Sequence, residues 1–186
     1  MKEIVWHGRG GQGAKTAATM LAAMAIHEGK YSQGSPEYGP ERQGAPMKGY
    51  TRISNDPIRI HSAISKGDIV MVLDASLLST VDILSTLKEQ AILIVNTKKS
   101  SDAIREEIGA SDEISIHTVD ATGISLDEVG RNLPNTPLLG ALVKVAGILS
   151  KDTVVKDLRE KFGKKFSEKV VEGNVRAVER AYEEVK

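Results

Sequence analysis

Short runs of apolar, often β-branched residues alternate along this chain with longer stretches of helical periodicity. Four such runs predict strands, at Lys2–His7, Asp68–Leu73, Ala91–Asn96 and Ser115–Val119. The two central runs are apolar at nearly every position, which is typical of parallel strands that are covered on both faces. The pattern therefore predicts an α/β fold, a three-layer α/β/α arrangement with a mainly parallel central sheet.

Apolar residues at intervals of three and four predict helices in the segments between and after these strands. A crossover helix is expected at Ser76–Lys88, and a short helix at Asp102–Gly109 ends on a glycine. A third, apolar helix is expected from Pro137 to Leu149, because proline is favoured in a first turn. Two C-terminal helices, Val154–Phe162 and Ser167–Val185, complete the predicted order.

One region interrupts this alternation. Residues 32–49 contain four glycines and three prolines, which is too many for a regular element and predicts a long, functional loop. After it, Tyr50–Ser54 and Ile58–His61 alternate around Asn55-Asp56-Pro57, which predicts an added β-hairpin. Such a hairpin would hold the loop against the amino-terminal turn if both lie at one end of the sheet.

The amino-acid composition excludes several kinds of function. With 186 residues, 40% of them hydrophobic and 27% charged, residues 1–186 are expected to form a single globular domain. The 25 basic and 25 acidic side chains balance, so neither nucleic acid nor a membrane surface is an expected partner. The absence of cysteine excludes disulfides and cysteine-ligated clusters within this chain. Without a leader or an apolar run that could span a bilayer, a cytoplasmic location is expected.

The glycine-rich segment His7–Thr16 follows the first strand and precedes a helix expected at Ala17–Ile26. Glycine destabilises regular elements, but it suits a tight turn whose bare backbone comes close to a ligand. Amide N–H groups would point outward there, at the positive end of the helix dipole, where an anion is stabilised. The segment predicts a docking point for a phosphate group or for a loop of another protein.

Two other interpretations of this segment stay open. Gly8, Gly10 and Gly13 satisfy the G-x-G-x-x-G pattern of dinucleotide-binding proteins, but Lys30–Gly34 lacks the acidic residue expected about 20 positions on. A stand-alone Rossmann-like nucleotide-binding protein is therefore the alternative function. In the plainest interpretation, the turn only packs a helix on a strand.

The loop segment Pro36–Pro46 combines a stiff backbone with charged and aromatic side chains. Arg42 could bind a phosphate or carboxylate bidentately. Glu37 and Glu41 beside an arginine more often form a local ion pair than a catalytic pair, so no catalytic or metal-ligating residue is expected. Asp74, at the end of a predicted strand, is expected to cap the following helix rather than to contact a ligand.

Together, Gly8–Ala14 and Pro36–Pro46 resemble the corresponding segments of the gamma subunit of 2-oxoacid:ferredoxin oxidoreductases of the pyruvate and 2-oxoisovalerate types. The segment Thr51–Ile58, the chain length and the order of elements are also similar to this family, so the resemblance covers essentially the whole chain. It implies a multi-subunit enzyme that oxidatively decarboxylates a 2-oxoacid with coenzyme A, giving acyl-CoA, CO₂ and reduced ferredoxin.

The resemblance also implies a division of labour. Thiamine diphosphate, Mg²⁺ and [4Fe–4S] clusters would belong to the alpha, beta and delta partner subunits, and this chain would meet ferredoxin only indirectly. It would be an accessory subunit that helps to complete the active site where coenzyme A arrives. The residues expected to contact the coenzyme or a partner loop are Gly10, Gly11, Gln12, Gly13, Tyr38, Glu41 and Arg42.

Overall fold

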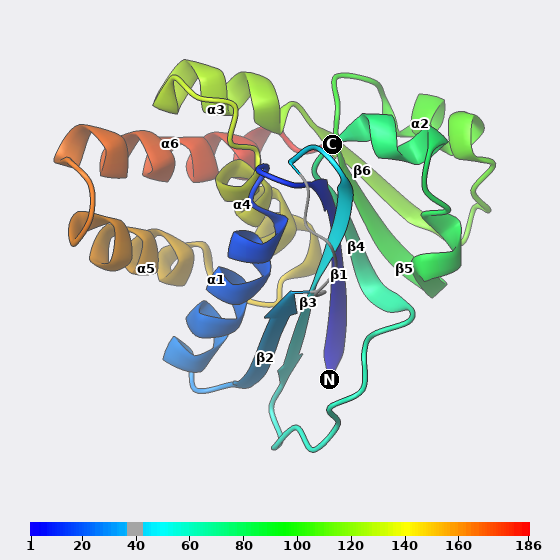
Figure 1. The fold of residues 1–186 in the computed structure, drawn as a ribbon, viewed down its shortest axis with the longest axis horizontal. Coiled ribbons are helices and arrows are strands. Elements are labelled where there is room, and N and C mark those ends of the chain that lie inside the picture. Colours follow the sequence, from blue (N-terminus) through cyan, green and yellow to red (C-terminus); the bar gives the residue numbers. More distant parts are fainter. Residues whose placement is uncertain (37–42) are drawn as a thin grey trace.

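The computed structural model describes residues 1–36 and 43–186, and its centre is a six-stranded mixed sheet in the order β2-β3-β1-β4-β5-β6 (Figure 1). The strands are β1 (Lys2–Arg9), β2 (Tyr31–Pro36), β3 (Pro46–Ser54), β4 (Gly67–Val72), β5 (Leu87–Asn96) and β6 (Ser115–Val119). β1, β4, β5 and β6 pair in parallel, whereas β3 pairs antiparallel with both β1 and β2. The sheet is therefore parallel on one side and carries a β2–β3 hairpin on the other.

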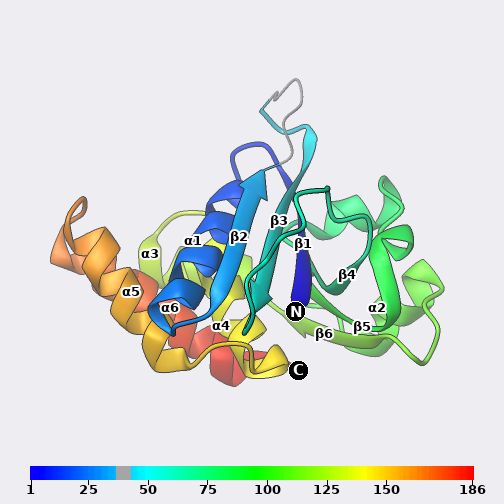
Figure 2. The same ribbon diagram turned by 90° about the horizontal axis from the view of Figure 1, so that it is seen from below.

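Helices cover both faces of the sheet (Figures 1 and 2). They are α1 (Ala14–His27), α2 (Ser101–Ile108), α3 (Ala121–Val129), α4 (Asn135–Ala146), α5 (Lys151–Gly163) and α6 (Glu168–Glu184). Trp6 and Met71 point into a core shared with α1 and α3–α6. Val5 and Val70 point into a second core shared with α2 and the β4–β5 connection. The predicted three-layer architecture is confirmed.

Helix α1 lies directly on the hairpin strands, and two glycines allow this approach. A Cβ atom at Gly34 would lie 2.9 Å from the Cβ of Ala22, and one at Gly49 would lie 3.1 Å from the Cβ of Ala18. The prediction that residues 32–49 form one irregular loop was therefore wrong at both ends. β2 and β3 occupy these ends, because their glycines make room for a helix rather than break a strand.

The predicted hairpin of Tyr50–Ser54 with Ile58–His61 was also wrong. β3 already has β1 on one side and β2 on the other, so it has no free edge for a third partner. Residues 58–61 form no strand, and Ile60 is 47% exposed. The true hairpin joins β2 to β3 across residues 37–45.

The predicted crossover helix at Ser76–Lys88 is replaced by two 3₁₀ turns, Ala75–Ser79 and Leu84–Thr86. Hydroxyl and carboxylate side chains compete here for the backbone groups that a helix would use. Thr80 Oγ1 donates to the carbonyl oxygen of Ser76, and Asp82 Oδ1 accepts from the amide of Ser85. β5 then begins at Leu87, earlier than predicted.

The remaining helices agree with prediction except at their ends. α2 ends at Gly109, whose φ of 65° is left-handed, as the sequence indicated. α4 has Pro137 in its first turn but ends before Gly147 (φ 60°), short of the expected Leu149. α3 was missed: its first turn is held by Asp120, which accepts from the amide of Gly123.

Candidate functional site

The glycine turn, residues 10–13, lies beside the described end of the long loop. The amide of Gly10 donates to the carbonyl of Ala45 at 2.9 Å, and the amide of Gly44 donates to the carbonyl of Gly10 at 3.1 Å. These bonds continue the β1–β3 pairing beyond Arg9 and Pro46. The expectation that the turn and the loop meet at one end of the sheet is confirmed for residues 43–45.

Two glycines of the turn adopt left-handed backbone angles. φ is 97° at Gly11 and 85° at Gly13, which caps the N-terminus of α1. A Cβ at Gly13 would also lie 2.8 Å from Cγ of Asn135, so a larger residue is excluded by both strain and space. Gly11 is exposed, and no atom of residues 1–36 and 43–186 lies within 4 Å of its would-be Cβ.

The turn and the start of α1 present unused amide donors. Within residues 1–36 and 43–186, the N–H groups of Gly11, Gly13 and Ala14 have no hydrogen-bond partner. The first turn of α1 has no acidic residue and no side-chain cap. The positive end of the helix dipole is therefore uncompensated in the part of the chain that is described, which favours an anion at this point.

The side chain of Gln12 is used inside the protein. Its Oε1 accepts from the amide of Arg9 at 2.8 Å, and its Nε2 donates to Asp74 Oδ2 at 2.7 Å. Both ends of the side-chain amide are thus engaged. Gln12 fixes the turn to the end of β4, so the structure places its side chain in a supporting position rather than facing outward.

Arg9 ties the loop to the same point. Its Nη1 donates to the carbonyl of Gly44 at 3.1 Å, and its Nη2 donates to Ser76 Oγ at 2.9 Å. Its Nε lies 3.3 Å from Asp74 Oδ2. We call Arg9, Gln12 and Asp74 the clasp, because these three side chains join the turn, the loop end and the β4 end.

Asp74 caps the 3₁₀ turn that follows β4, as the sequence indicated. Its Oδ1 accepts from the amide of Ser76 at 3.0 Å and from the Ser76 hydroxyl at 2.6 Å. Burial alone would raise the pKa of Asp74, but hydrogen bonds from Ser76 and Gln12 and the charge of Arg9 outweigh it and lower this pKa below its ordinary value. The carboxylate is therefore charged at neutral pH.

Asn135 is a residue of this region that sequence reasoning missed. It begins α4, is 7% exposed and lies against Gly13. Its Oδ1 is buried and has no hydrogen-bond partner in the described parts of the chain. A lone asparagine ahead of an apolar helix carries no distinguishing signal, so only the packing of α4 against α1 reveals it.

His7, directly before the turn, is not available to a ligand. It is 2% exposed, and its ring nitrogen Nε2 lies 3.1 Å from Thr86 Oγ1. Because Thr86 donates its own proton to the carbonyl of Ile83, His7 donates to Thr86. Burial, with a smaller effect of Lys48, lowers the pKa of His7 to about 4, so the ring is neutral.

The other predicted site residues cannot be placed. Tyr38, Glu41 and Arg42 lie outside the described residues. Within the described ranges, no three histidine, aspartate or glutamate side chains are grouped so that they could hold a metal ion. No helix in those ranges is both long and apolar enough to cross a membrane.

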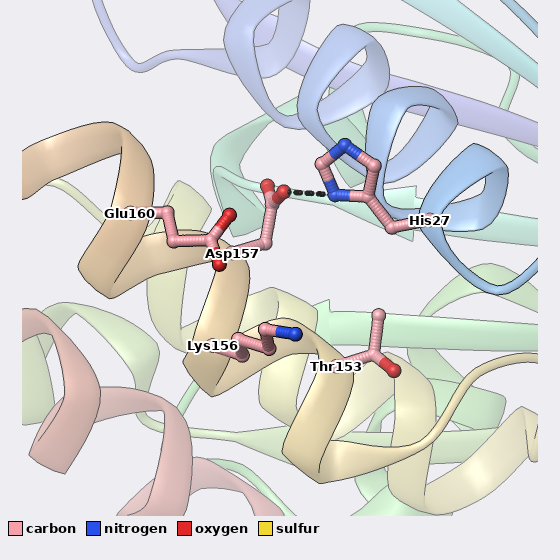
Figure 3. A pocket seen from close by; sticks show the side chains of 5 residues that line it. All are labelled: His27, Thr153, Lys156, Asp157 and Glu160. Atoms are coloured by element: carbon pink, nitrogen blue, oxygen red, sulfur yellow. Dashed lines mark ion pairs between the residues drawn. The ribbon is translucent and has the colours of Figure 1, made fainter.

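A separate hollow lies at the opposite end of α1, where His27 faces α5 (Figure 3). Its volume is about 320 Å³, and it is lined by His27, Thr153, Lys156, Asp157 and Glu160. His27 Nδ1 lies 2.6 Å from the buried carboxylate of Asp157, which also pairs with Lys161 at 2.7 Å. Acidic and basic groups balance here, so this contact joins α1 to α5 rather than forming a site for an anion.

Comparison with known proteins places the fold and this turn in a family. Residues 3–184 match the pyruvate ferredoxin/flavodoxin oxidoreductase family. The chain is 50% identical over 184 residues to the pyruvate synthase subunit PorC of Thermotoga maritima, covering 99% of this chain and 94% of that one. It is 45% identical to the common gamma subunit of the pyruvate/ketoisovalerate oxidoreductases of Thermococcus kodakarensis, covering 98% and 96% of the two chains.

The crystal structure of the Thermotoga maritima pyruvate oxidoreductase subunit PORC has the same fold, with a TM-score of 0.87 over 100% of this chain and 98% of that chain. The Rossmann-like alternative is disfavoured, because the strand after α1 does not pair with β1 as in a dinucleotide-binding βαβ unit; the antiparallel strand β3 lies between them. The resemblance noted from the glycine turn and the loop is confirmed. This chain belongs to the pyruvate ferredoxin/flavodoxin oxidoreductase family, as a subunit of the gamma (PorC) type.

Proposed function

We propose that this chain is the gamma subunit of a cytoplasmic 2-oxoacid:ferredoxin oxidoreductase that acts on pyruvate or a branched-chain 2-oxoacid. The complex joins the acyl group to coenzyme A, releases CO₂ and passes two electrons to ferredoxin. Near full-length similarity to subunits of pyruvate and ketoisovalerate oxidoreductases supports this reaction class. The pairing of Gly10 with Gly44 and Ala45 is the observation that carries this chain's own role, because it makes one surface of two segments.

The redox chemistry belongs to partner subunits in this proposal. Iron–sulfur clusters are held by cysteine thiolates, and this chain has no cysteine. Thiamine diphosphate, Mg²⁺ and [4Fe–4S] clusters are therefore assigned to alpha, beta and delta chains. This subunit contributes binding and orientation.

Coenzyme A is the ligand proposed for the glycine turn. Its phosphate groups suit the unused N–H donors of Gly11, Gly13 and Ala14, which are reinforced by the dipole of α1. A helix N-terminus stabilises an anion by roughly 0.3–1 kcal/mol when exposed and more when partly buried. Asn135, with an unpartnered Oδ1 beside Gly13, lies within the same region.

The predicted contact residues then divide into two roles. Gly11 and Gly13 would bind through their backbone amides, whereas Gly10 and Gln12 would shape the turn, since their own donors are already used. Tyr38, Glu41 and Arg42 would contact the polar groups of the coenzyme or the neighbouring subunit. The clasp would hold the loop end so that these side chains arrive beside the turn.

A matched pair of glycine variants tests the turn. Gly11 and Gly29 both have positive φ, and no atom of the described residues lies within 4 Å of a would-be Cβ at either, so alanine imposes similar strain at both sites, about 1–2 kcal/mol. In the assembled enzyme, Gly11→Ala should raise the KM for coenzyme A several-fold, whereas Gly29→Ala should leave it unchanged. Equal KM values in the two variants would refute coenzyme binding at the turn.

Arg42→Ala tests the loop. We expect the KM for coenzyme A to rise about tenfold or the complex to dissociate more readily, because a charge-assisted hydrogen bond contributes about 1.5–3 kcal/mol. Arg59→Ala is the control, since Arg59 is exposed and has no ion pair in the described chain. Unchanged KM and unchanged assembly would argue against Arg42.

The isolated chain separates the proposal from its alternative. A gamma subunit is catalytically silent alone and copurifies anaerobically with thiamine- and cluster-containing proteins. A stand-alone nucleotide-binding protein would instead bind NAD(P) or ATP in a calorimetric titration of the purified chain.

A further inference from the structure

Helices α5 and α6 form a hairpin that projects from the body of the molecule (Figures 1 and 2). The last buried residue of α5 is Leu158 and the first of α6 is Val171, and none of residues 159–170 is buried. The hairpin therefore extends past the part that its own core needs. We call Lys164–Lys169, the turn and the first residues of α6, the hairpin tip.

An aromatic side chain is held at this tip. The chain has only two phenylalanines: Phe166 lies in the tip, and Phe162 lies just before it at the end of α5. The rings of Phe162 and Phe166 meet edge to face with centroids 5.4 Å apart, and the amide of Phe166 donates to the carbonyl of Phe162 at 2.8 Å. Phe166 is nevertheless 50% exposed. It is thus an apolar side chain held by a ring contact and presented to the outside at the end of a projecting hairpin.

Charge pairing changes along the hairpin. Below the tip the three arginines are neutralised: Arg159 pairs with Glu172, Arg176 with Glu128, and Arg180 with Glu128 and Glu184.

At the tip itself, Lys164, Lys165 and Lys169 have no ion pair in the described parts of the chain, and one carboxylate, Glu168, accompanies them. Because the whole chain has no net charge, this uncompensated positive charge is local.

These features together fit a protein partner better than a nucleic acid or a lipid surface. A nucleic-acid or membrane surface is recognised by an extended basic stripe or amphipathic face. Here the arginines of the hairpin are already paired, and the basic charge surrounds a single aromatic ring. An aromatic anchor with a polar, charged rim is the usual composition of a protein–protein contact.

We infer that the hairpin tip docks on an acidic surface of another subunit of the same enzyme, with Phe166 entering an apolar recess and the lysines facing carboxylates. The inference rests on the proposed function, since it names how this subunit is held in its complex. The tip lies well away from the glycine turn in both ribbon views (Figures 1 and 2). Docking at the tip would therefore leave the turn free to bind its ligand.

Zero-length carbodiimide crosslinking of the purified complex tests the contact directly. The reagent joins an ammonium group to a carboxylate only when the two touch. We expect Lys164 or Lys165 to be joined to an aspartate or glutamate of another subunit, identified by mass spectrometry. Crosslinks from these lysines only to carboxylates of this chain would overturn the inference.

Charge reversal gives the energetic test. K164E/K165E should weaken retention of this chain in the complex about tenfold at low salt, with a smaller effect at high salt where charges are screened. F166A should weaken it at every salt concentration. R59E/K66E is the matched control, because it makes the same charge change at two exposed residues without ion pairs in the described chain, far from the tip.

The outcomes are distinguishable. If the unaltered chain enters no thiamine- and cluster-containing complex, the proposed function fails and the inference fails with it. If the unaltered chain assembles and K164E/K165E assembles equally well at each salt concentration, only the docking inference is overturned. Loss of binding to anionic vesicles or RNA in the same variant, with assembly unchanged, would also overturn it. Thermal melting of each variant is the control that checks whether the fold is retained.

Discussion

The glycine turn and the hairpin tip are both exposed, yet they offer different chemical groups to a partner. At the turn, the side chains of Arg9, Gln12 and Asp74 bind one another, and the groups left over are backbone amides. At the tip, the amides of Lys164, Lys165 and Phe166 all donate to the carbonyl of Phe162, and the side chains presented to the outside are lysines and a phenylalanine. The first surface depends on backbone shape, whereas the second depends on side-chain identity.

This difference predicts how each region responds to substitution. A region that works through its backbone tolerates few changes, because any Cβ alters its shape. A region that works through exposed side chains can be changed without loss of fold. The following variants test that contrast, from the largest expected effect to the smallest.

Gly13→Val should have the largest effect, because φ is 85° at Gly13 and the new Cβ would lie 2.8 Å from Cγ of Asn135. Strain and overpacking together should lower the free energy of unfolding by roughly 3 kcal/mol. Gly163→Ala, in α5 next to the tip with open space around it, should raise stability by about 0.5–1 kcal/mol. Urea unfolding measures both, and similar losses in the two variants would break the contrast.

His7→Gln should weaken the pH dependence of stability that arises from the buried histidine beside the glycine turn. The folded pKa of His7 is about 4 against 6.5 for the free side chain, so between these values the unfolded chain binds more protons. Stability is therefore complete above pH 6.5 and falls as the pH drops towards 4, by roughly 3 kcal/mol in all. Unfolding at pH 4.5 and 7 should show a smaller difference in the variant. A variant with an unchanged profile would contradict a buried, neutral His7.

Asp74→Ala should open the clasp, leaving Arg9 and Gln12 without their shared partner. We expect a loss of about 1–3 kcal/mol at pH 7. Because the pKa of Asp74 is lowered in the folded state, its contribution is present above the ordinary carboxyl pKa and is lost as the pH falls through the lowered one. Asp127→Ala removes an exposed partner of Arg180 on the hairpin and should change stability by less than about 1 kcal/mol. Equal losses would mean that the clasp is no more than a surface ion pair.

K164E/K165E should have the smallest effect on the isolated chain, within about 0.5 kcal/mol, because exposed charges without partners contribute little to folding. Calorimetric melting of the isolated chain measures it. A large loss of stability would show that the lysines support the fold rather than a contact.

Sequence patterns predicted the layers of the fold well, since continuous apolar runs report burial on both faces. β4 and β5 were found from such runs, β6 from a short β-branched run, and the terminal helices from their periodicity. The β2–β3 hairpin was not predicted, because Gly34 and Gly49 suggest interrupted strands in the sequence. Only the packing of α1 on these strands shows why glycine is needed there. Ile58–His61 had the alternation of a strand, but pairing also requires a free neighbouring edge, which no local pattern reports.

The sequence predicted where the glycine turn lies, but not which side chains meet there. The glycines indicated an open backbone turn, because few other roles require so many of them. The sequence could not show that Gln12 turns inward to Asp74, since residues 62 positions apart meet only in the folded sheet. Asn135 was invisible for the same reason. Tyr38, Glu41 and Arg42 stay predictions.

Helix α1 runs from the glycine turn to the base of the hairpin that carries the tip. It starts at the glycine turn, runs about 21 Å at 1.5 Å per residue, and ends at His27, which is paired with Asp157 of α5. Lys161, the other partner of Asp157, lies in the last turn of α5. One rigid helix thus joins the glycine turn, the proposed ligand site, to the base of the projecting hairpin. If the hairpin tilts on assembly, we expect the amides at the far end of α1 to shift, and by reciprocity a ligand at the turn would then change the affinity of the hairpin for its partner by the same factor.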